Sequence, residues 1–301
     1  MQLWRHSDSV RRGAQVGLGH AGAPMRHSSA AARHLAALPP AEVLYADLDG
    51  TLLGPGGSLL TGPDGGPSAR AAQALVDARA AGITVVPVTG RRALALDGDT
   101  RLLGLRDYIA EVGTVILRAG RRRYEWGSCP ADLRAAAATP RAALDSAGAL
   151  DVLLAAFPGD LRPFLPWDAD REGGHLLHGR VDVAVANAAL SAQGVGWAYL
   201  VDNGAAGGWP GRRVRAYHLL PRGVGKAVAV ADDLAERGLE RSQAAACGDS
   251  LEDLTMAGVV GTYFQVANGH GEPGGNAFGV PGAMGHGFAD AVGLLVAARG
   301  R

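Results

Sequence analysis

The sequence is almost without lysine: among its 29 basic residues, Lys226 is the only one that is not arginine. Such a bias, together with 45 glycines, is typical of a coding sequence that disfavours lysine codons. A lysine retained against this bias needs a structural or chemical reason. Lys226 is therefore a candidate functional residue.

Other absences narrow the class of protein. Two cysteines cannot form a disulfide framework, and no run of about 18 apolar residues suggests a membrane span. The 29 acidic residues balance the 29 basic ones, so no overall field favours a nucleic-acid or membrane partner. We expect a globular, cytoplasmic protein whose oligomeric state the sequence does not indicate. At 301 residues and 48% hydrophobic, it can bury one large core and a smaller accessory domain.

Residues 1–39 differ in composition from the rest of the chain. They contain several arginines, a single acidic residue, Asp8, and no steady apolar period, which predicts a flexible tail. Residues 17–22 match the G-x-G-x-x-G dinucleotide pattern, but no convincing strand precedes them and no clear helix follows. We therefore favour the tail over a dinucleotide site.

The next part of the chain alternates buried strands with helices. Residues 43–46 are uniformly apolar and residues 83–88 are mostly so, which predicts two buried strands, and the Ala-rich segment 68–81 between them favours a helix. The same alternation returns in the segments 224–237, 244–247, 252–257 and 262–266. Strand–helix–strand units of this kind predict a Rossmann-like α/β core with a parallel sheet flanked by helices.

The region between the two α/β blocks has a different sequence pattern. The pattern predicts a hairpin that turns at Gly120, then a helix over 141–157, and then mixed strands and helices. We expect residues 113–217 to form an inserted α+β domain with an antiparallel sheet, and residues 40–112 and 218–301 to form the core.

Polar residues follow the predicted core strands at their carboxyl ends, where ligands collect in an open parallel sheet. These residues are Asp47, Asp49, Thr89, Asp249 and Asp253. Four carboxylates in one crevice would repel one another and raise each other's pKa unless a cation compensates. An all-oxygen set of ligands suits Mg²⁺, which shares itself with phosphate oxygens.

A metal, one lysine and a threonine at a strand end are suited together to bind a phosphoryl group. The metal, Lys226 and the Thr89 hydroxyl would meet the charge on the phosphoryl oxygens. Asp47 could attack as a covalent nucleophile, while Asp49, two residues on, could protonate the leaving oxygen.

Four segments in order carry a resemblance to a known family. They are DLDGT at 47–51, VVPVTGR at 85–91, GVGKA at 223–227 and GDSLED at 248–253. They resemble the motifs of the haloacid dehalogenase-like (HAD) phosphatase superfamily. The resemblance implies that Asp47 is the nucleophile and Asp49 the acid/base, and that Thr89, Gly90 and Lys226 bind the phosphoryl group. It also implies Mg²⁺ ligation by Asp47, Asp249 and the backbone carbonyl of Asp49, with Asp253 supporting the site.

The position of the insertion resembles a subgroup of that superfamily. A cap between Thr89 and Lys226 is similar to the type II caps of the Cof-like, sucrose-phosphate phosphatase-like and mannosyl-phosphoglycerate phosphatase-like branches, which act mostly on phosphorylated sugars. The segment at 110–117 is similar to their E-N-G-A motif, with Val112 in place of Asn, and Asn268 resembles the Asn after their last core strand. Glu252 departs from the Asn that these branches often have.

Three further residues have two open interpretations. Arg91 could contact the substrate or form a structural ion pair. His178 and Arg180 could lie on a cap face that meets the substrate, or could be ordinary cap residues.

The sequence thus predicts a Mg²⁺-dependent phosphatase that hydrolyses a small phosphorylated metabolite, such as a sugar phosphate, through an aspartyl-phosphate. Two alternatives stay open: a phosphosugar mutase, and a non-catalytic phosphate-binding protein with the same fold.

Overall fold

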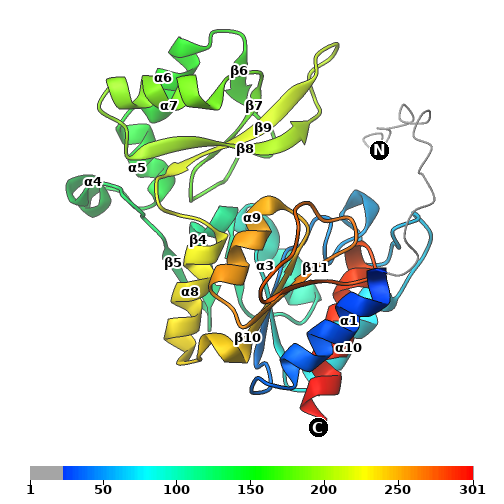
Figure 1. The fold of residues 1–301 in the computed structure, drawn as a ribbon. Helices are drawn as coiled ribbons and strands as arrows, with labels where there is room; N and C mark the ends of the chain where they lie inside the picture. Colours follow the sequence, from blue (N-terminus) through cyan, green and yellow to red (C-terminus); the bar gives the residue numbers. More distant parts are fainter. Residues whose placement is uncertain (1–22, 301) are drawn as a thin grey trace.

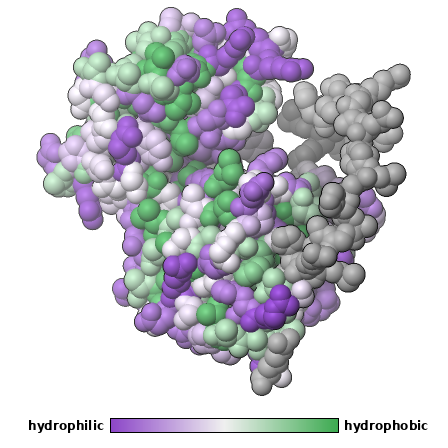
Figure 2. Space-filling view, in the orientation of Figure 1, coloured by the Kyte–Doolittle hydropathy of each residue, from purple (hydrophilic) through white to green (hydrophobic). Residues whose placement is uncertain are grey.

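The structure is a computed structural model that describes residues 23–300. Residues 1–22, which include the G-x-G-x-x-G pattern, and residue 301 lie outside the described residues. The described chain forms a lower lobe around a parallel sheet and an upper lobe around an antiparallel sheet (Figure 1). Figure 2 shows polar and apolar residues interspersed over the visible face of both lobes.

The lower lobe is built on a five-stranded sheet with the order β12-β11-β10-β1-β2, in which all strands run parallel. The strands are β1 (Val43–Ala46), β2 (Thr84–Pro87), β10 (Ala244–Gly248), β11 (Thr262–Gln265) and β12 (Ala277–Gly279). All four residues of β1 are buried, as expected of a strand with helices on both faces. The predicted Rossmann-like core is confirmed.

Two helical layers cover this sheet (Figure 1). One layer contains α1 (Ala23–Leu35), α2 (Arg70–Ala80), α3 (Ala93–Leu102) and α10 (Met284–Arg299); the other contains α8 (Lys226–Arg237) and α9 (Leu251–Leu254). Alternate residues of β1 serve the two layers: Leu44 packs with the first, and Val43 and Tyr45 pack with the second. The core therefore consists of two apolar clusters, one on each face.

The predicted flexible tail was wrong for residues 23–35, which form α1. Ala31 and Leu35, four residues apart, are buried in the same cluster as α10. His34 hydrogen-bonds to the Gly261 carbonyl oxygen at 3.0 Å and lies against the Phe278 ring. Alanine gives a weak apolar signal, so the buried face of this helix was hidden among arginine, serine and alanine.

A small antiparallel sheet extends the lower lobe. It contains β3 (Tyr108–Ala110), β4 (Val115–Arg118) and β5 (Arg121–Tyr124), and the hairpin turns at Gly120 as predicted. Ile109 and Ile116 pack in the same cluster as β1. The hairpin therefore belongs to the core, although the sequence pattern predicts a cap that begins at residue 113. A hairpin pattern does not reveal the lobe on which it packs.

The upper lobe, called the cap below, contains a four-stranded antiparallel sheet with the order β6-β7-β9-β8. Its strands are β6 (Leu161–Pro163), β7 (His175–Gly179), β8 (Ala198–Ala206) and β9 (Val214–Pro221). Its helices are α4 (Ala131–Ala136), α5 (Pro140–Ser146), α6 (Ala149–Ala156) and α7 (Val183–Ala192). The predicted inserted domain with an antiparallel sheet is confirmed.

The helix predicted over 141–157 is two helices, α5 and α6. Gly148 lies between them with a φ of 67°, in the left-handed region that glycine adopts without strain. The apolar period continues across this glycine, so the period alone did not reveal the break.

One face of the cap sheet carries the cap helices and the other faces the core. On β9, Tyr217 and Leu219 pack with α5, α6 and α7, whereas Leu220 packs with Val112 and Val224 of the core side. In Figure 1 the cap sheet accordingly lies between the cap helices and the lower lobe. The open face of the sheet therefore lies above the carboxyl ends of the core strands.

From residue 23 to residue 300, none of the helices combines the length and the apolar character needed to cross a bilayer. The cytoplasmic location stays a prediction.

Candidate active site

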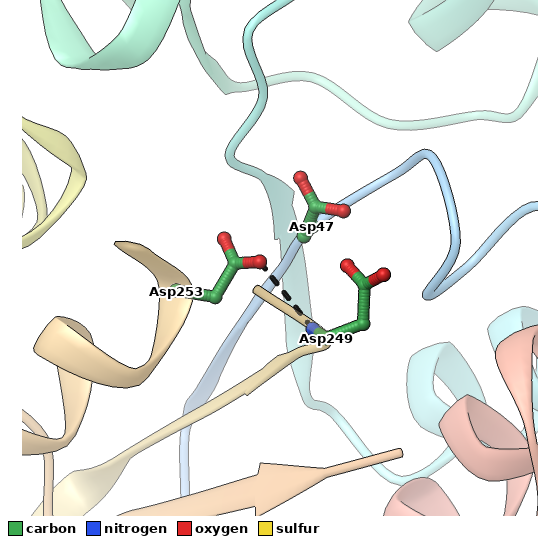
Figure 3. A group of neighbouring side chains, drawn as sticks. All are labelled: Asp47, Asp249 and Asp253. Atoms are coloured by element: carbon green, nitrogen blue, oxygen red, sulfur yellow. Dashed lines mark hydrogen bonds between the residues drawn. The ribbon is translucent and has the colours of Figure 1, made fainter. Parts of the chain in front are cut away.

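Three carboxylates meet where two neighbouring core strands end. Asp47 follows β1 and Asp249 follows β10, and the pairing of Ala46 with Cys247 places these two residues beside each other. Asp253 comes from the first turn of α9. The three side chains point into one space (Figure 3), and each offers an oxygen within 4.8 Å of the others.

Local backbone chemistry fixes Asp253. Ser250 begins α9 in a capping box, and Oδ2 of Asp253 accepts hydrogen bonds from the Ser250 N–H at 2.9 Å and the Ser250 hydroxyl at 2.6 Å. A side chain at Gly248 would come within 2.2 Å of the Asp253 Cβ. The glycine in the G-D-S segment is therefore needed for this close approach.

Lys226 is the first residue of α8 and lies between two of these carboxylates. Its buried Nζ donates to Asp47 Oδ1 at 2.8 Å and to Asp253 Oδ1 at 2.7 Å. Burial alone would lower the pKa of the ammonium group, but the two carboxylates outweigh burial and the net shift is upward. Lys226 is therefore a cation in the folded protein. Its ion pairs with two buried carboxylates explain why the chain keeps a lysine at this position.

The three carboxylates carry more negative charge than one ammonium can neutralise. Burial raises the pKa of Asp47 to about 8, with Lys226 lowering it and Asp253 raising it further. Burial and Asp253 also raise the pKa of Asp249. A divalent cation would relieve this repulsion, and the all-carboxylate set fits Mg²⁺. These residues thus fit the metal that the sequence predicted.

Thr89 and Gly90 lie at the same edge of the sheet, just beyond β2. Thr89 is 2% exposed, and its Oγ1 accepts a hydrogen bond from the Arg91 N–H at 3.2 Å. The Gly90 carbonyl oxygen accepts from Arg171 Nη2 of the cap at 2.9 Å. The hydroxyl proton of Thr89 is thus available to an acceptor at this edge.

The carboxylate of Asp49 lies outside the acidic group and pairs with Arg91. Arg91 Nη2 and Nε donate to the two oxygens of Asp49 at 2.6 and 2.7 Å, in the bidentate geometry typical of arginine. Asp49 is 55% exposed in its side chain, and Arg91 also pairs with Asp99 at 3.3 Å. Of the two interpretations of Arg91, the structure therefore shows the ion pair.

Asn268 joins the loop after β1 to the metal-site carboxylate. Its Nδ2 donates to the Gly50 carbonyl oxygen at 2.9 Å and to Asp249 Oδ2 at 3.4 Å, while its Oδ1 accepts the Met284 N–H. Glu252, which departs from the family pattern, lies beside Lys226. Burial raises the pKa of Glu252, while the Lys226 ammonium and backbone N–H lower it.

The structure does not bring His178 and Arg180 together with the core motifs. His178 stacks on Phe164 at 4.3 Å between ring centroids and contacts Trp209 of the cap. Arg180 is exposed and lines a cavity that is formed by cap residues alone, among them Arg212. A substrate-facing role for either residue stays a prediction.

Two cap residues that reach the site were missed. Arg171 bonds to the Gly90 carbonyl oxygen, and the His218 ring lies against Gly90. The alternation of β9 could have found His218, because Tyr217 and Leu219 read as the buried cap face and place His218 on the opposite one. No pattern in the sequence identifies Arg171, which lies in a loop.

No family model matches the chain, and no curated protein matches it by sequence. Solved structures do match, at low identity. Thermoplasma acidophilum 0175 has a TM-score of 0.61 and 17% identity, over 85% of this chain and 99% of that one. The sucrose-phosphatase of Synechocystis sp. PCC6803 has a TM-score of 0.57 and 17% identity, over 85% and 98%.

A third match is BT1666 from Bacteroides thetaiotaomicron, described among the phosphatases of the HAD enzyme superfamily. Its TM-score is 0.55 at 19% identity, over 86% of this chain and 94% of that one. These matches extend over both lobes, because each covers about 85% of this chain. The chain therefore shares the two-lobed fold of these proteins, one of which is described among the phosphatases of the HAD enzyme superfamily.

Proposed function

We propose that the protein is a Mg²⁺-dependent phosphatase that hydrolyses a small phosphorylated metabolite, such as a sugar phosphate, through an aspartyl-phosphate. One observation carries the proposal: Asp47 lies between a buried ammonium and two further carboxylates at the strand ends beneath the cap. Such a site balances a charged nucleophile against the charge of a phosphate ester.

Asp47 performs the first step. One of its carboxylate oxygens attacks phosphorus, the bond from phosphorus to the ester oxygen breaks, and Asp49 gives its proton to the departing alcohol. The Thr89 hydroxyl and the Lys226 ammonium donate to the phosphoryl oxygens. Asp47, Asp249 and the Asp49 carbonyl, with support from Asp253, would hold Mg²⁺, and the metal would neutralise part of the phosphoryl charge.

The second step restores the protein. Asp49, now a carboxylate, takes a proton from water, whose oxygen attacks phosphorus and breaks the bond to Asp47. Phosphate leaves and Asp49 is again protonated. Because Asp49 pairs with Arg91 in this structure, its acid–base role requires it to leave that pair and turn towards the substrate.

The comparisons support the chemistry and the size of the substrate. The sucrose-phosphatase structure is a complex with sucrose and phosphate, the two products expected of a sugar-phosphate ester. The absence of net charge on this chain agrees with a small substrate rather than a nucleic acid.

The test is incubation of the purified protein with a panel of sugar and polyol phosphates, with Mg²⁺ and with a chelator. We expect free phosphate to appear in the presence of Mg²⁺ and to cease with the chelator. An isomeric ester in place of free phosphate would identify a mutase. Binding without turnover would identify a phosphate-binding protein, and either result would overturn the proposed hydrolysis.

A further inference from the structure

His218 is a buried polar residue without a partner. It is 2% exposed, and neither Nδ1 nor Nε2 forms a hydrogen bond with any residue of the described chain. Buried ring nitrogens are normally paired, and an unpaired one lowers stability. An apolar side chain would fill the same space without this cost, so the imidazole needs another explanation.

The ring lies over the edge of the predicted phosphate site. A Cβ placed on Gly90 would be 3.5 Å from His218 Nε2 and 3.9 Å from a methyl group of Val112. Gly90 follows Thr89 directly, and its carbonyl oxygen is bonded to Arg171. His218 thus reaches down from the cap sheet to the loop that ends β2, beside the residues assigned to the phosphoryl group.

The surroundings keep the ring neutral. Burial lowers the pKa of His218 well below its ordinary value, and the charges of Arg171 and Lys226 lower it further, while Asp168 opposes them. A neutral imidazole presents one N–H donor and one nitrogen acceptor. A ligand group that can both accept and donate a hydrogen bond can therefore pair with either ring nitrogen.

A hydroxyl group meets this requirement and a phosphoryl oxygen does not. Phosphoryl oxygens of a dianion only accept, and Lys226 and the Thr89 hydroxyl already offer them donors from the core side. A hydroxyl on the alcohol part of an ester can accept from the ring N–H or donate to the bare ring nitrogen, so it can pair with whichever nitrogen faces it.

We propose that His218 is a substrate-contacting residue that recognises a hydroxyl group on the alcohol part of the phosphate ester. This inference rests on the proposed phosphatase function. It assigns the substrate to the phosphate esters of polyhydroxylated alcohols, and it gives the cap a residue that selects them against plain alkyl phosphates.

The test uses ester pairs that differ only in hydroxyl groups. Glucose 6-phosphate is paired with (tetrahydropyran-2-yl)methyl phosphate, and sorbitol 6-phosphate with n-hexyl phosphate. We expect His218→Phe to lower kcat/KM for the hydroxylated ester by about 10- to 100-fold and to change that for its plain partner by less than about threefold. His218→Gln, which keeps a donor and an acceptor, should retain most of the selectivity.

Two controls separate substrate recognition from a structural role. Tyr217→Phe alters the neighbouring residue on the opposite face of β9 and should leave the selectivity unchanged. Inhibition by inorganic phosphate, which has no alcohol part, should be the same in the wild type and in His218→Phe. A tenfold weaker inhibition in the variant would assign His218 to the phosphoryl group and overturn the proposal.

The remaining outcomes are also distinct. If the wild type hydrolyses esters but His218→Phe affects both members of a pair equally, or neither, the assignment of His218 is wrong and the phosphatase stands. If the wild type releases phosphate from no ester, the proposed function fails and the assignment of His218 fails with it.

Discussion

At the scale of single residues, the candidate site brings several charged groups together in a buried space. Three carboxylates share it with one ammonium, and Lys226 bonds to two of them. A hydrogen bond from Lys226 holds the Asp47 side chain in place. Burial disfavours the charged form of the Asp47 carboxylate. Removing that charge should therefore affect chemistry and stability in opposite directions.

Asp47→Asn should abolish turnover, with a loss of at least about a thousandfold, because the amide is isosteric but a poor nucleophile. Its folding should be intact, and without Mg²⁺ its thermal stability should equal or exceed that of the wild type, since one of three repelling charges is gone. Phosphate release and thermal denaturation measure the two effects. Asp77→Asn, on the exposed face of α2, is the matched control. Near-normal turnover in Asp47→Asn would exclude the covalent mechanism.

His218 predicts a pH dependence of stability. Its pKa in the folded protein lies below the ordinary value of about 6.5, so the unfolded chain takes up a proton first as the pH falls. Stability is therefore lost as the pH falls below about 6.5, by up to about 1.4 kcal/mol per pH unit. The charged groups around the ring, Arg171, Lys226 and Asp168, remain in the variant His218→Phe.

Urea unfolding of the wild type and His218→Phe at pH 7.5 and 5.5 measures this effect. The wild type should lose about 1 kcal/mol more than the variant between the two pH values. An equal loss in both proteins would show that His218 is not held neutral in the fold.

At the scale of elements, one turn of the core holds the cap in place. Glu111 is fully buried after β3 and accepts backbone N–H groups from both lobes: Ala93 at the start of α3, and Glu172 and Gly173 in a cap loop. A side chain at Gly173 would come within 1.7 Å of the Thr114 hydroxyl oxygen. Side chains of the turn therefore contact the backbone of the cap loop directly.

Glu111→Ala should destabilise the protein by about 2–4 kcal/mol, because it leaves three N–H groups without an acceptor. Glu111→Gln keeps one acceptor oxygen and should lose about half as much. Glu42→Ala, at an exposed glutamate, should change the free energy of unfolding by less than about 0.5 kcal/mol. Hydrogen exchange at residues 172 and 173 should rise in Glu111→Ala; unchanged exchange there would contradict the anchoring role.

Some elements of the fold could be predicted from the sequence and others could not. Strands such as Val43–Ala46 were predictable because a short, uniformly apolar run has few other structures. The convergence of the candidate site residues was predictable because parallel strands end at one edge, whatever fills the rest of the fold. The break at Gly148 and the helix α1 were not, because they depend on tertiary packing that no local period records. The alternation of β9 places His218 on the face opposite Tyr217 and Leu219, but only the position of the cap shows that this face meets the core.

At the scale of the whole molecule, the site joins two blocks of sequence that the cap separates. Asp47 and Lys226 are 179 residues apart in the chain, yet Lys226 Nζ lies 2.8 Å from Asp47 Oδ1 in the fold. The three clustered carboxylates likewise come from both blocks. A ligand that binds them should therefore stabilise the fold as a whole.

Mg²⁺ should raise the melting temperature of the wild type, because it binds only where the carboxylates converge. At a concentration 100 times its Kd, the stabilisation should be about 2.7 kcal/mol. Asp249→Asn should remove most of this shift. Sodium chloride at matched ionic strength controls for screening. Equal shifts with Mg²⁺ in the wild type and Asp249→Asn would show that the metal does not bind at this site.

The scarcity of lysine has a practical consequence for the folded protein. Apart from the N-terminal amine, the only amine that an acylating reagent can modify is the side chain of Lys226, which is buried and protonated. Acylation at residue 226 should therefore proceed only when the lobes part or the core unfolds. The amount of adduct at Lys226 then reports, without any engineered label, how often this edge of the sheet becomes accessible.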